Sequence, residues 1–341
     1  MSELLFEPAA TPDEAPKKKK KFLSTIVSII SVLLIIACIV WFFFGQWIRD
    51  YISSTIFEPS PEMANAIEKV GFTWRGNLIA RATHPAFETA ETFNGNCPDD
   101  GENISTLGCY MPSENRVHIY DIRSDELDGV KESVLAHEVL HAIYARLNDI
   151  DLSNLNPELD SFYKSHKDSF GDYMDTYDED QYYTELHSII GQRVHYKDLS
   201  EPLQKHYAKY FSNQDAVVDF YDKYHDVIDE LSEQIDTGKA EIDKLYAELQ
   251  TMRTNYRTRL DEYNKDVEYH NSQVAQGIYS ETRYQSLKKR EAELDVELKG
   301  LNDFIEDYNI KARAYNELIE RQQQLYGTMN SKNEIKTEKT E

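Results

Sequence analysis

Cysteine is scarce in this sequence, with three residues among 341. No two cysteines have the CxxC spacing that is typical of metal sites, so a cysteine-based zinc centre is not predicted. Cys38 lies in an apolar run and is expected to pack as a small hydrophobic residue. Cys97 and Cys109 flank a polar loop, and they could form a disulfide if this loop lies outside the cytosol. Two free thiols, or a pair at strand ends serving another purpose, are the alternatives.

Basic residues are also few: 37 Lys and Arg stand against 61 Asp and Glu, for a formal charge of −24. A surface this negative repels phosphate backbones, so we expect no nucleic acid partner. Part of the acidic excess lies in the C-terminal part, where it would keep a long exposed surface soluble. An acidic docking surface is the alternative interpretation. The apolar content of 40% still allows a sizeable core.

Charged residues are absent from residues 22–48, a run long enough to cross a bilayer core at about 1.5 Å per residue. Lys17–Lys21 precede this run, and lysines collect on the cytoplasmic side of membranes. We therefore predict a cell-membrane protein with a cytoplasmic tail over 1–21, a transmembrane helix over 22–48 and an extracytoplasmic remainder. No small-x-small cleavage site closes the run, which favours an uncleaved anchor over a signal peptide.

The next part of the chain is predicted to contain a linker and a domain. Residues 49–62 contain two prolines and are expected to form a juxtamembrane linker, followed by a domain over 63–224. Within this domain, residues 71–89 alternate enough to predict a strand with flanking turns, and Val117–Ile122 predicts a second short strand. The polar stretch 149–180 is expected to form a loop with a short helix.

The C-terminal part has the pattern of a coiled coil. Over 225–327, apolar or small residues recur in steps of three and four, and charged residues flank them. A break at Gly277 separates two arms of similar length, each roughly 60 Å long at 1.5 Å per residue. This favours an antiparallel hairpin, and a continuous rod that dimerises in parallel is the alternative. Residues 328–341 are polar and are expected to form a disordered tail.

A helix is predicted over 130–147, and it carries the stretch AHEVLHAIY (136–144). His137 and His141 are four residues apart, so their side chains project from one face, one turn apart. Two such imidazoles can bind one tetrahedral zinc ion at about 2.0–2.1 Å. Glu138 is rotated off this pair, and in zinc peptidases such a carboxylate acts as the base on the attacking water. Burying these groups is costly without partners, which favours a metal site over incidental surface histidines.

A catalytic zinc needs a third protein ligand and a fourth position left for water. The HExxHxxGxxH pattern is absent, because Tyr144 and Leu147 occupy its later positions. The other common solution is a glutamate on a later helix, and Glu185 is the best candidate. It lies on a helix predicted over 180–194, which is expected to end near Gly191.

Three histidines compete with Glu185 as the third ligand: His187, His195 and His166. His187 is the most serious competitor, but it lies two residues from Glu185 and so points to a nearly opposite face. A hydrogen-bonded structural role is the favoured interpretation for it. A donor for the developing oxyanion is also required, and four residues are candidates without one being favoured: Tyr182, Tyr183, His187 and His195.

HEVLH followed by a glutamate on a downstream helix resembles the gluzincin group of zinc metallopeptidases. Over about residues 70–220, LGCY…VHIYDI…LDGVKESVLAHEVLHAIYARL…YYTELHSIIG is similar to a set of membrane-anchored bacterial proteins. The resemblance implies a zincin-like domain in which both histidines of the motif and Glu185 bind zinc and Glu138 is the base. It also implies that strand Val117–Ile122 borders the cleft, where an extended peptide could add as another strand.

The sequence departs from the family pattern at one position. Thermolysin-like members carry an aspartate four residues after the ligand glutamate, where it orients a ligand histidine. Ile189 stands at this position here, so the partner of that histidine must come from elsewhere in the chain or be missing.

These features predict an α+β protein, mainly α. It would have a zincin-like metallopeptidase domain with a small sheet, preceded by one transmembrane helix and followed by an antiparallel helical hairpin. The predicted function is zinc-dependent hydrolysis of a peptide or protein substrate outside the cytoplasmic membrane, with a possible protein partner for the coiled coil. The alternative is a coiled-coil binding or scaffold protein of the cell envelope with a structural or degenerate zinc site. Glu138 favours the enzyme, because a structural zinc site needs no base beside the metal.

Overall fold

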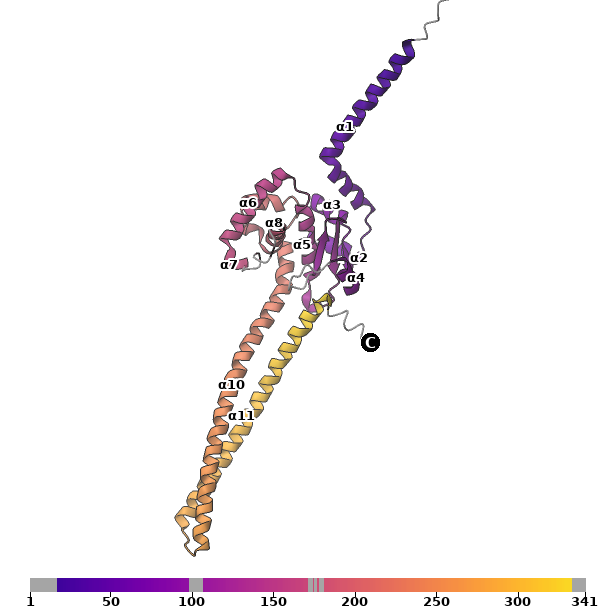
Figure 1. Cartoon of the computed structure of the whole chain (residues 1–341). Helices are drawn as coiled ribbons and strands as arrows, with labels where there is room; N and C mark the ends of the chain where they lie inside the picture. The colour runs from indigo at the N-terminus through magenta and orange to yellow at the C-terminus, as the bar shows by residue number, and fades with distance from the viewer. Residues whose placement is uncertain (1–16, 98–106, 171–173, 175–176, 178–180, 333–341) are drawn as a thin grey trace, which may run out of the picture.

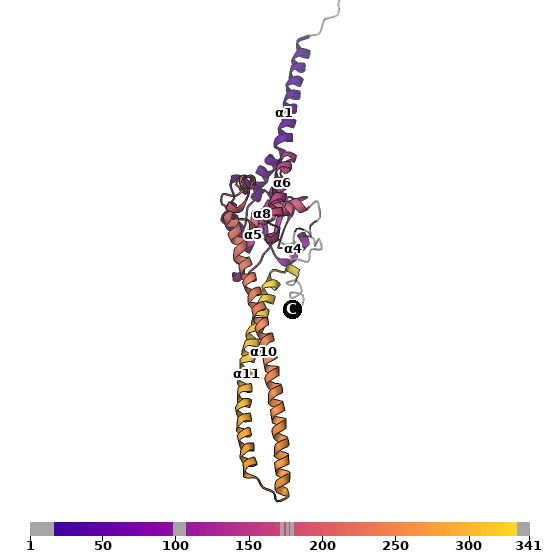
Figure 2. The same ribbon diagram turned by 90° about the vertical axis from the view of Figure 1, so that its left-hand side faces the viewer.

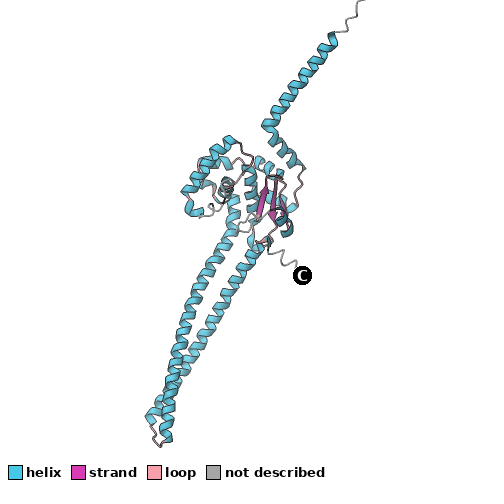
Figure 3. Cartoon of the chain, viewed as in Figure 1, coloured by secondary structure: helices cyan, strands magenta, loops and turns pink. Residues whose placement is uncertain are grey.

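The computed structural model describes residues 17–97, 107–170, 174, 177 and 181–332. The described chain is mainly helical, with a small three-stranded sheet (Figure 3). Its elements in chain order are α1 (Lys17–Ile56), α2 (Pro61–Val70), α3 (Trp74–Ala82), β1 (Ala86–Glu88), α4 (Ala90–Asn96), β2 (Gly108–Met111), β3 (Arg116–Tyr120), η1 (Asp125–Leu127), α5 (Val130–Tyr144), α6 (Asp149–Ser165), α7 (Lys167–Phe170), α8 (Tyr182–Arg193), η3 (Tyr196–Asp198), α9 (Glu201–Tyr207), α10 (Asp215–Ala275) and α11 (Glu281–Thr328). Helix α1 leaves the central domain on one side, and the pair α10 and α11 leaves it on the opposite side (Figures 1 and 2).

Helix α1 contains an apolar window, Thr25–Phe42, with a mean hydropathy of 2.8. By length and composition this helix could cross a membrane. The predicted cytoplasmic tail lies mostly outside the described residues, which begin at residue 17.

Helix α1 does not end at residue 48, where the predicted transmembrane segment ends. It continues to Ile56, through the first half of the segment predicted as a linker. Asp50 in this continuation is only 4% exposed and forms an ion pair with Arg146 at 2.9 Å. The chain that enters the domain is therefore a packed helix and not a free connection.

Residues 71–89 differ from the predicted strand, because Trp74–Ala82 in the middle of this segment form helix α3. Thr73 begins the helix by accepting a hydrogen bond from the backbone N–H of Gly76 on its Oγ1 (3.2 Å). The buried residues Leu78, Ile79 and Ala82 follow helical spacing, which the short segment hid among polar neighbours. Within this segment, the strand is limited to Ala86–Glu88, which form β1.

The sheet has the strand order β1-β3-β2, with β1 parallel and β2 antiparallel to β3. The strand predicted over Val117–Ile122 is present as β3, but it lies in the centre of the sheet. The expectation that this strand borders the cleft is therefore wrong, because both of its edges are paired. In the part of the chain that the structure describes, β2 is the edge strand next to the HExxH helix.

A disulfide joins Cys97, at the end of α4, to Cys109 in β2, with 6.0 Å between their Cα atoms. This confirms the pairing that the sequence suggested. Residues 98–106 between them lie outside the described part of the chain. The bond fixes β2 to the helix that covers one face of the sheet, while the other face packs on α5.

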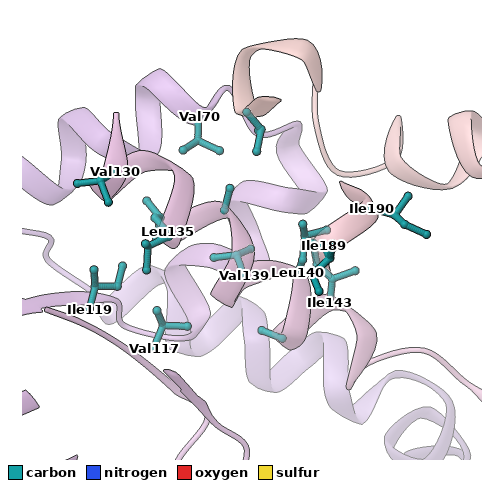
Figure 4. Close-up of a cluster of buried hydrophobic side chains, with 14 of the residues drawn as sticks. Val70, Val117, Ile119, Val130, Leu135, Val139, Leu140, Ile143, Ile189 and Ile190 are labelled. Carbon is teal, nitrogen blue, oxygen red and sulfur yellow. The ribbon is translucent and has the colours of Figure 1, made fainter. Parts of the chain in front are cut away.

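Helix α5 forms the centre of the core (Figure 4). It starts at Val130, directly after Gly129, and its apolar residues meet α2, α8, α10 and the sheet. Buried side chains surround it on nearly every side, as the close-up shows for Val117 and Ile119 from β3 and Ile189 and Ile190 from α8. Polar side chains on this helix therefore need partners inside the fold.

Helix α6 replaces much of the loop that was predicted over 149–180. Asn148 caps it by accepting hydrogen bonds from the backbone N–H groups of Ile150 and Asp151, both at 3.0 Å. A proline within the helix and many polar residues concealed it in the sequence. Leu155, Leu159 and Phe162 are nevertheless buried at spacings of four and three.

Helices α10 and α11 form the predicted antiparallel hairpin, joined by a turn in which Gly277 has a φ of 80°. Such a left-handed conformation favours glycine. Leucines are buried between the two arms (Leu249, Leu287, Leu294, Leu301). Arg259 and Glu293, 3.2 Å apart, form one of the ion pairs that link the arms. These contacts within one chain exclude the continuous rod for this structure.

The hairpin is joined to the domain at both ends. Helix α10 begins at Asp215, ahead of the predicted boundary at 225, and buries Val217 and Val218 in the core. Beyond α11, Met329 and Ser331 are buried, and Ser331 donates a hydrogen bond to Asn94 in α4 (2.8 Å). The tail predicted to be disordered from residue 328 is therefore packed as far as the described chain extends.

Candidate metal site

The HExxH helix and α8 bring three potential ligands together. His137 Nε2 and His141 Nε2 lie 3.0 Å apart. The two carboxylate oxygens of Glu185 lie 3.6 Å from His137 Nε2 and 3.4 Å from His141 Nε2. Elsewhere in the described residues, no group of three histidine, cysteine or acidic side chains brings its ligand atoms so close.

These separations suit a tetrahedral ion. Ligand atoms at bond lengths of about 2.0–2.1 Å around a tetrahedral zinc lie about 3.4 Å from one another. The three observed separations, 3.0, 3.4 and 3.6 Å, lie on both sides of this value. The three side chains are each between 12 and 18% exposed, so the cluster is sheltered but open to solvent. The set of two imidazoles and one carboxylate could therefore hold a metal ion and leave room for a small ligand.

Two polar residues of α8 orient the histidines by contacting their Nδ1 atoms, which face away from the cluster. His141 Nδ1 lies 2.9 Å from Thr184 Oγ1, and His137 Nδ1 lies 3.2 Å from Gln192 Oε1. Gln192 is held in turn, because its Nε2 donates to the Oγ of Ser133 (2.9 Å). A histidine that donates from Nδ1 keeps the Nε2 lone pair free for a metal. Ile189 cannot accept a hydrogen bond from a ligand histidine. Thr184 and Gln192, which lie before and after it on α8, make these contacts instead.

The protonation states of the side chains in the cluster also favour binding of a cation. Burial, together with the charge of His137, lowers the pKa of His141 to about 4, although Glu185 opposes this shift. His141 is therefore neutral at pH 7. Burial disfavours a charge on His137, but the carboxylates of Glu185 and Glu138 raise its pKa overall. Burial likewise acts to raise the pKa of Glu185, yet the two imidazoles lower it on balance. Two buried carboxylates beside the imidazoles favour a positive charge between them.

Glu138 is buried beside the cluster, at 6% exposure. Burial and the nearby charge of Glu185 raise its pKa to about 7, while His137 and the backbone N–H of Tyr110 act in the opposite direction. Its neighbour in β2 is a glycine: a Cβ built on Gly108 would lie 2.8 Å from Glu138 Cγ and 2.6 Å from Val134 Cγ1. Only glycine at this position lets the edge strand lie directly against the carboxylate.

A second glycine allows α8 to pack closely on the HExxH helix. Gly191 does not end α8, as the sequence suggested, because the helix continues to Arg193. A Cβ on Gly191 would lie 2.7 Å from Tyr207 Cε1 and 2.8 Å from Leu140 Cδ1. The glycine therefore permits close packing of the two helices that carry the ligands, and the extra turn brings Gln192 to His137.

The competing histidines make contacts away from the cluster. His187 is fully buried, and its Nε2 lies 2.9 Å from Nε2 of His206, which fits the structural role favoured for it. His195 contacts Asp215 (3.2 Å), and His166 contacts the backbone oxygen of Phe162 (2.9 Å). None of the three belongs to the ligand group found among the described residues.

The tyrosines considered as oxyanion donors are engaged with α6. Both Tyr182 and Tyr183 donate hydrogen bonds to the carboxylate of Asp160, at 3.3 and 3.0 Å. Burial and the Asp160 charge raise the pKa of Tyr182 to about 12, so it stays protonated.

A hollow of about 440 Å³ lies at the other end of α5, near Lys69 and Lys131, and includes no residue of the cluster. Neither the two tyrosines nor this hollow adds a residue to the candidate site.

The sequence analysis missed Thr184, Gln192 and Gly108. Helical spacing could have found Gln192, because it lies seven residues after Glu185, two turns along the same face. It could not have found Thr184, because side chains of adjacent helical residues such as Thr184 and Glu185 do not share a face. Gly108 left no comparable signal, because its role depends on which strand packs against Glu138.

Comparison with known proteins does not assign a function to this site. No protein family, no curated protein and no solved structure matches the chain.

Proposed function

We propose that the chain is a membrane-anchored zinc metallopeptidase that hydrolyses peptide bonds outside the cytoplasmic membrane. One observation carries the proposal: His137, His141 and Glu185 converge within bonding range of one ion, and a buried glutamate stands beside them. His₂Glu is an established ligand set of catalytic zinc, and it leaves one position for water.

Each residue of the site would have its own role in the hydrolysis. The two histidines and Glu185 would hold zinc, which when bound supplies a Lewis acid that polarises a carbonyl and acidifies water. Glu138 would accept a proton from the attacking water and pass it to the leaving amine. A carboxyl whose pKa burial has raised to about 7 is suited to both steps near neutral pH. Thr184 and Gln192 would hold the imidazoles in the required tautomer.

The unpaired edge of β2 is the surface proposed to receive the substrate. Among the described residues, strand β2 pairs with β3 alone, and its residues Gly108 and Tyr110 contact Glu138. An extended peptide that added to this edge through backbone hydrogen bonds would lie beside the general base. The substrate would then be recognised mainly through its backbone.

A scaffold function is the second candidate, and the free end of the hairpin favours it. Apolar side chains around the turn are strongly exposed (Tyr269, Val274, Ile278 and Tyr279, between 44 and 59%). Exposed patches of this kind often mark contact sites for other proteins. A protein partner bound there would be compatible with either function. Glu138 favours the peptidase, because a scaffold with a structural metal has no need of a buried base.

The orientation is proposed from the lysines that precede the apolar helix. Lys17–Lys21 would keep the N-terminus in the cytoplasm, so that the domain and the hairpin lie outside. The disulfide between Cys97 and Cys109 supports this placement, because disulfides persist in oxidising compartments.

Metal analysis of the full-length chain in detergent tests the proposal. The wild type should hold about one zinc per chain, and Glu185→Ala should lose most of it. Glu138→Gln should keep the zinc and abolish the hydrolysis of cellular proteins that appears when the wild-type chain is produced. Glu248→Ala, an exposed change on α10, is the matched control and should retain both properties. Full zinc content in Glu185→Ala would remove that residue from the ligand set, and unchanged hydrolysis in Glu138→Gln would reject the base.

A further inference from the structure

The helix that could cross the membrane also packs on the domain that holds the candidate active site. Helix α1 is one continuous element from its apolar window Thr25–Phe42 to Ile56, it bends before it reaches the domain (Figure 1), and its last turns pack along α3. Ser53 Oγ donates to the backbone oxygen of Ala82 (2.9 Å), and Arg81 donates to that of Phe57 (2.7 Å). These contacts fix the last turn of α1 to the domain.

One arginine ties this helix to the HExxH helix and to the edge strand. Arg146, just after α5, forms a two-pronged ion pair with Asp50, with both N–O distances at 2.9 Å. The two side chains are 8 and 6% exposed. The same guanidinium donates to the backbone oxygen of Ala142 (2.7 Å) in α5 and to Asn115 (2.6 Å) in the β2–β3 turn. Tyr110 of β2 donates in turn to Asn115 (3.1 Å).

These connections limit the height of the site above a bilayer. Asp50 lies eight residues beyond Phe42, or about 12 Å along the helix, and His141 lies five residues before Arg146, or about 8 Å. The paired side chains add at most roughly 12 Å, given bond lengths of about 1.5 Å. The path from the end of the apolar window to His141 is therefore at most about 32 Å. An extended polypeptide covers that distance in roughly ten residues.

We infer that the site acts on juxtamembrane segments of proteins anchored in the same bilayer, an inference that rests on the proposed metallopeptidase function. A segment within roughly ten residues of a membrane span can reach a site held this low. Confinement of enzyme and substrate to one bilayer also raises their effective concentration. Arg146 and Asp50 act as positioning residues, because they set the height and contact no reacting atom.

The test maps cleavage positions in cells that produce the full-length chain. New N-termini that appear with the wild type and not with Glu138→Gln are identified by mass spectrometry. We expect them in membrane-anchored proteins, within about ten residues of the end of a span on the extracytoplasmic side.

A lengthened anchor makes the test specific. Seven helix-forming residues inserted between Gly45 and Gln46 add two turns, or about 10 Å, and leave the domain facing nearly the same way. Cleavage positions should then move about three residues farther from the span. The same insertion at Gly277, in the hairpin turn, is the control and should leave them unchanged. Zinc content equal to that of the wild type would show that both variants keep the site intact.

The outcomes separate the inference from the function on which it depends. Glu138-dependent termini scattered through soluble proteins, or positions that stay fixed in the lengthened variant, would overturn the inference and leave the peptidase standing. A complete lack of Glu138-dependent termini would overturn the proposed peptidase and the inference with it.

Discussion

The orientation of the ligand histidines depends on two polar side chains of α8. Thr184 and Gln192 accept hydrogen bonds from the Nδ1 atoms of His141 and His137. Each contact fixes one ring and one tautomer, and so aims the other ring nitrogen at the position of the ion. Gln192 is the more constrained of the two, because its amide also donates to Ser133 on the opposite helix.

Gln192→Ala should therefore weaken zinc binding by about 10–100-fold without unfolding the domain. The reason is that His137 loses the acceptor that fixes its tautomer and rotation. Competition with a chromogenic chelator measures the affinity of the full-length chain. Gln323→Ala makes the same change on the exposed surface of α11 and should bind zinc as the wild type does. Wild-type affinity in Gln192→Ala would show that the contact does not orient the ligand.

The sequence predicted the two histidines from helical spacing, and it predicted Glu185 from the ligand set that is established for catalytic zinc. His137 and His141 share a face of α5 whatever surrounds it, and the later helix offers one suitable carboxylate. Gly108 could not be found in the same way. Its importance comes from strand β2 lying against Glu138, which depends on the strand order of the sheet and not on local pattern.

At the scale of elements, the packing of α8 on α5 sets the geometry of the cluster. The two helices meet where Gly191 faces Leu140 and Tyr207. Sequence reasoning treated this glycine as the end of a helix, because glycine often terminates helices. Its actual role is close contact, which is visible only when the facing helix is known.

Gly191→Ala is expected to destabilise the domain and to reduce zinc binding. Alanine favours a helix by about 1 kcal/mol over glycine, but overpacking at this contact typically costs about 1–3 kcal/mol. Moving α8 away would also move Glu185 and Gln192 away from the histidines. Gly300→Ala is the matched control, because no atom lies within 4 Å of its added Cβ in α11, and it should be neutral or stabilising. Urea midpoints and zinc content measure the two effects, and equal values for both variants would contradict the packing argument.

Several elements could be read from the sequence and others could not. Helix α5 and the hairpin were predicted because their apolar repeats are long and regular. Helix α3 was missed because it is short, and α6 was predicted only as a short helix within a loop because it contains Pro157 and many polar residues. Both helices are stabilised by burial of one face against the rest of the domain. The local sequence pattern does not show this burial.

At the scale of the whole molecule, the anchor and the hairpin extend from opposite sides of the domain (Figures 1 and 2). Helix α10 alone has 61 residues, or about 90 Å of helix. If α1 crosses a membrane, the exposed residues at the hairpin turn lie far from that bilayer. The molecule would then place its candidate active site close to the lipid and a potential contact surface far above it.

The stability of the whole domain should depend on a second pair of histidines, away from the metal site. His206 in α9 and His187 in α8 share a hydrogen bond between their Nε2 atoms at 2.9 Å, and both are buried. Burial, helped by the nearby charges of Lys209 and Arg75, lowers the pKa of His206 to about 3. In the unfolded chain a histidine titrates near its usual value of about 6.5. Between these values the unfolded state binds a proton that the folded state does not.

The free energy of unfolding should therefore fall as the pH decreases from about 6.5 toward 3, by up to about 1.4 kcal/mol per pH unit from His206. His206→Gln removes this group, so its stability should decline less steeply over the same range. Urea midpoints from near-ultraviolet circular dichroism, taken with a chelator present so that zinc release adds nothing, give the comparison. His225→Gln alters a half-exposed histidine on α10 and should keep the wild-type slope. If the slopes of all three proteins coincide, the buried pair does not govern the acid stability of the domain.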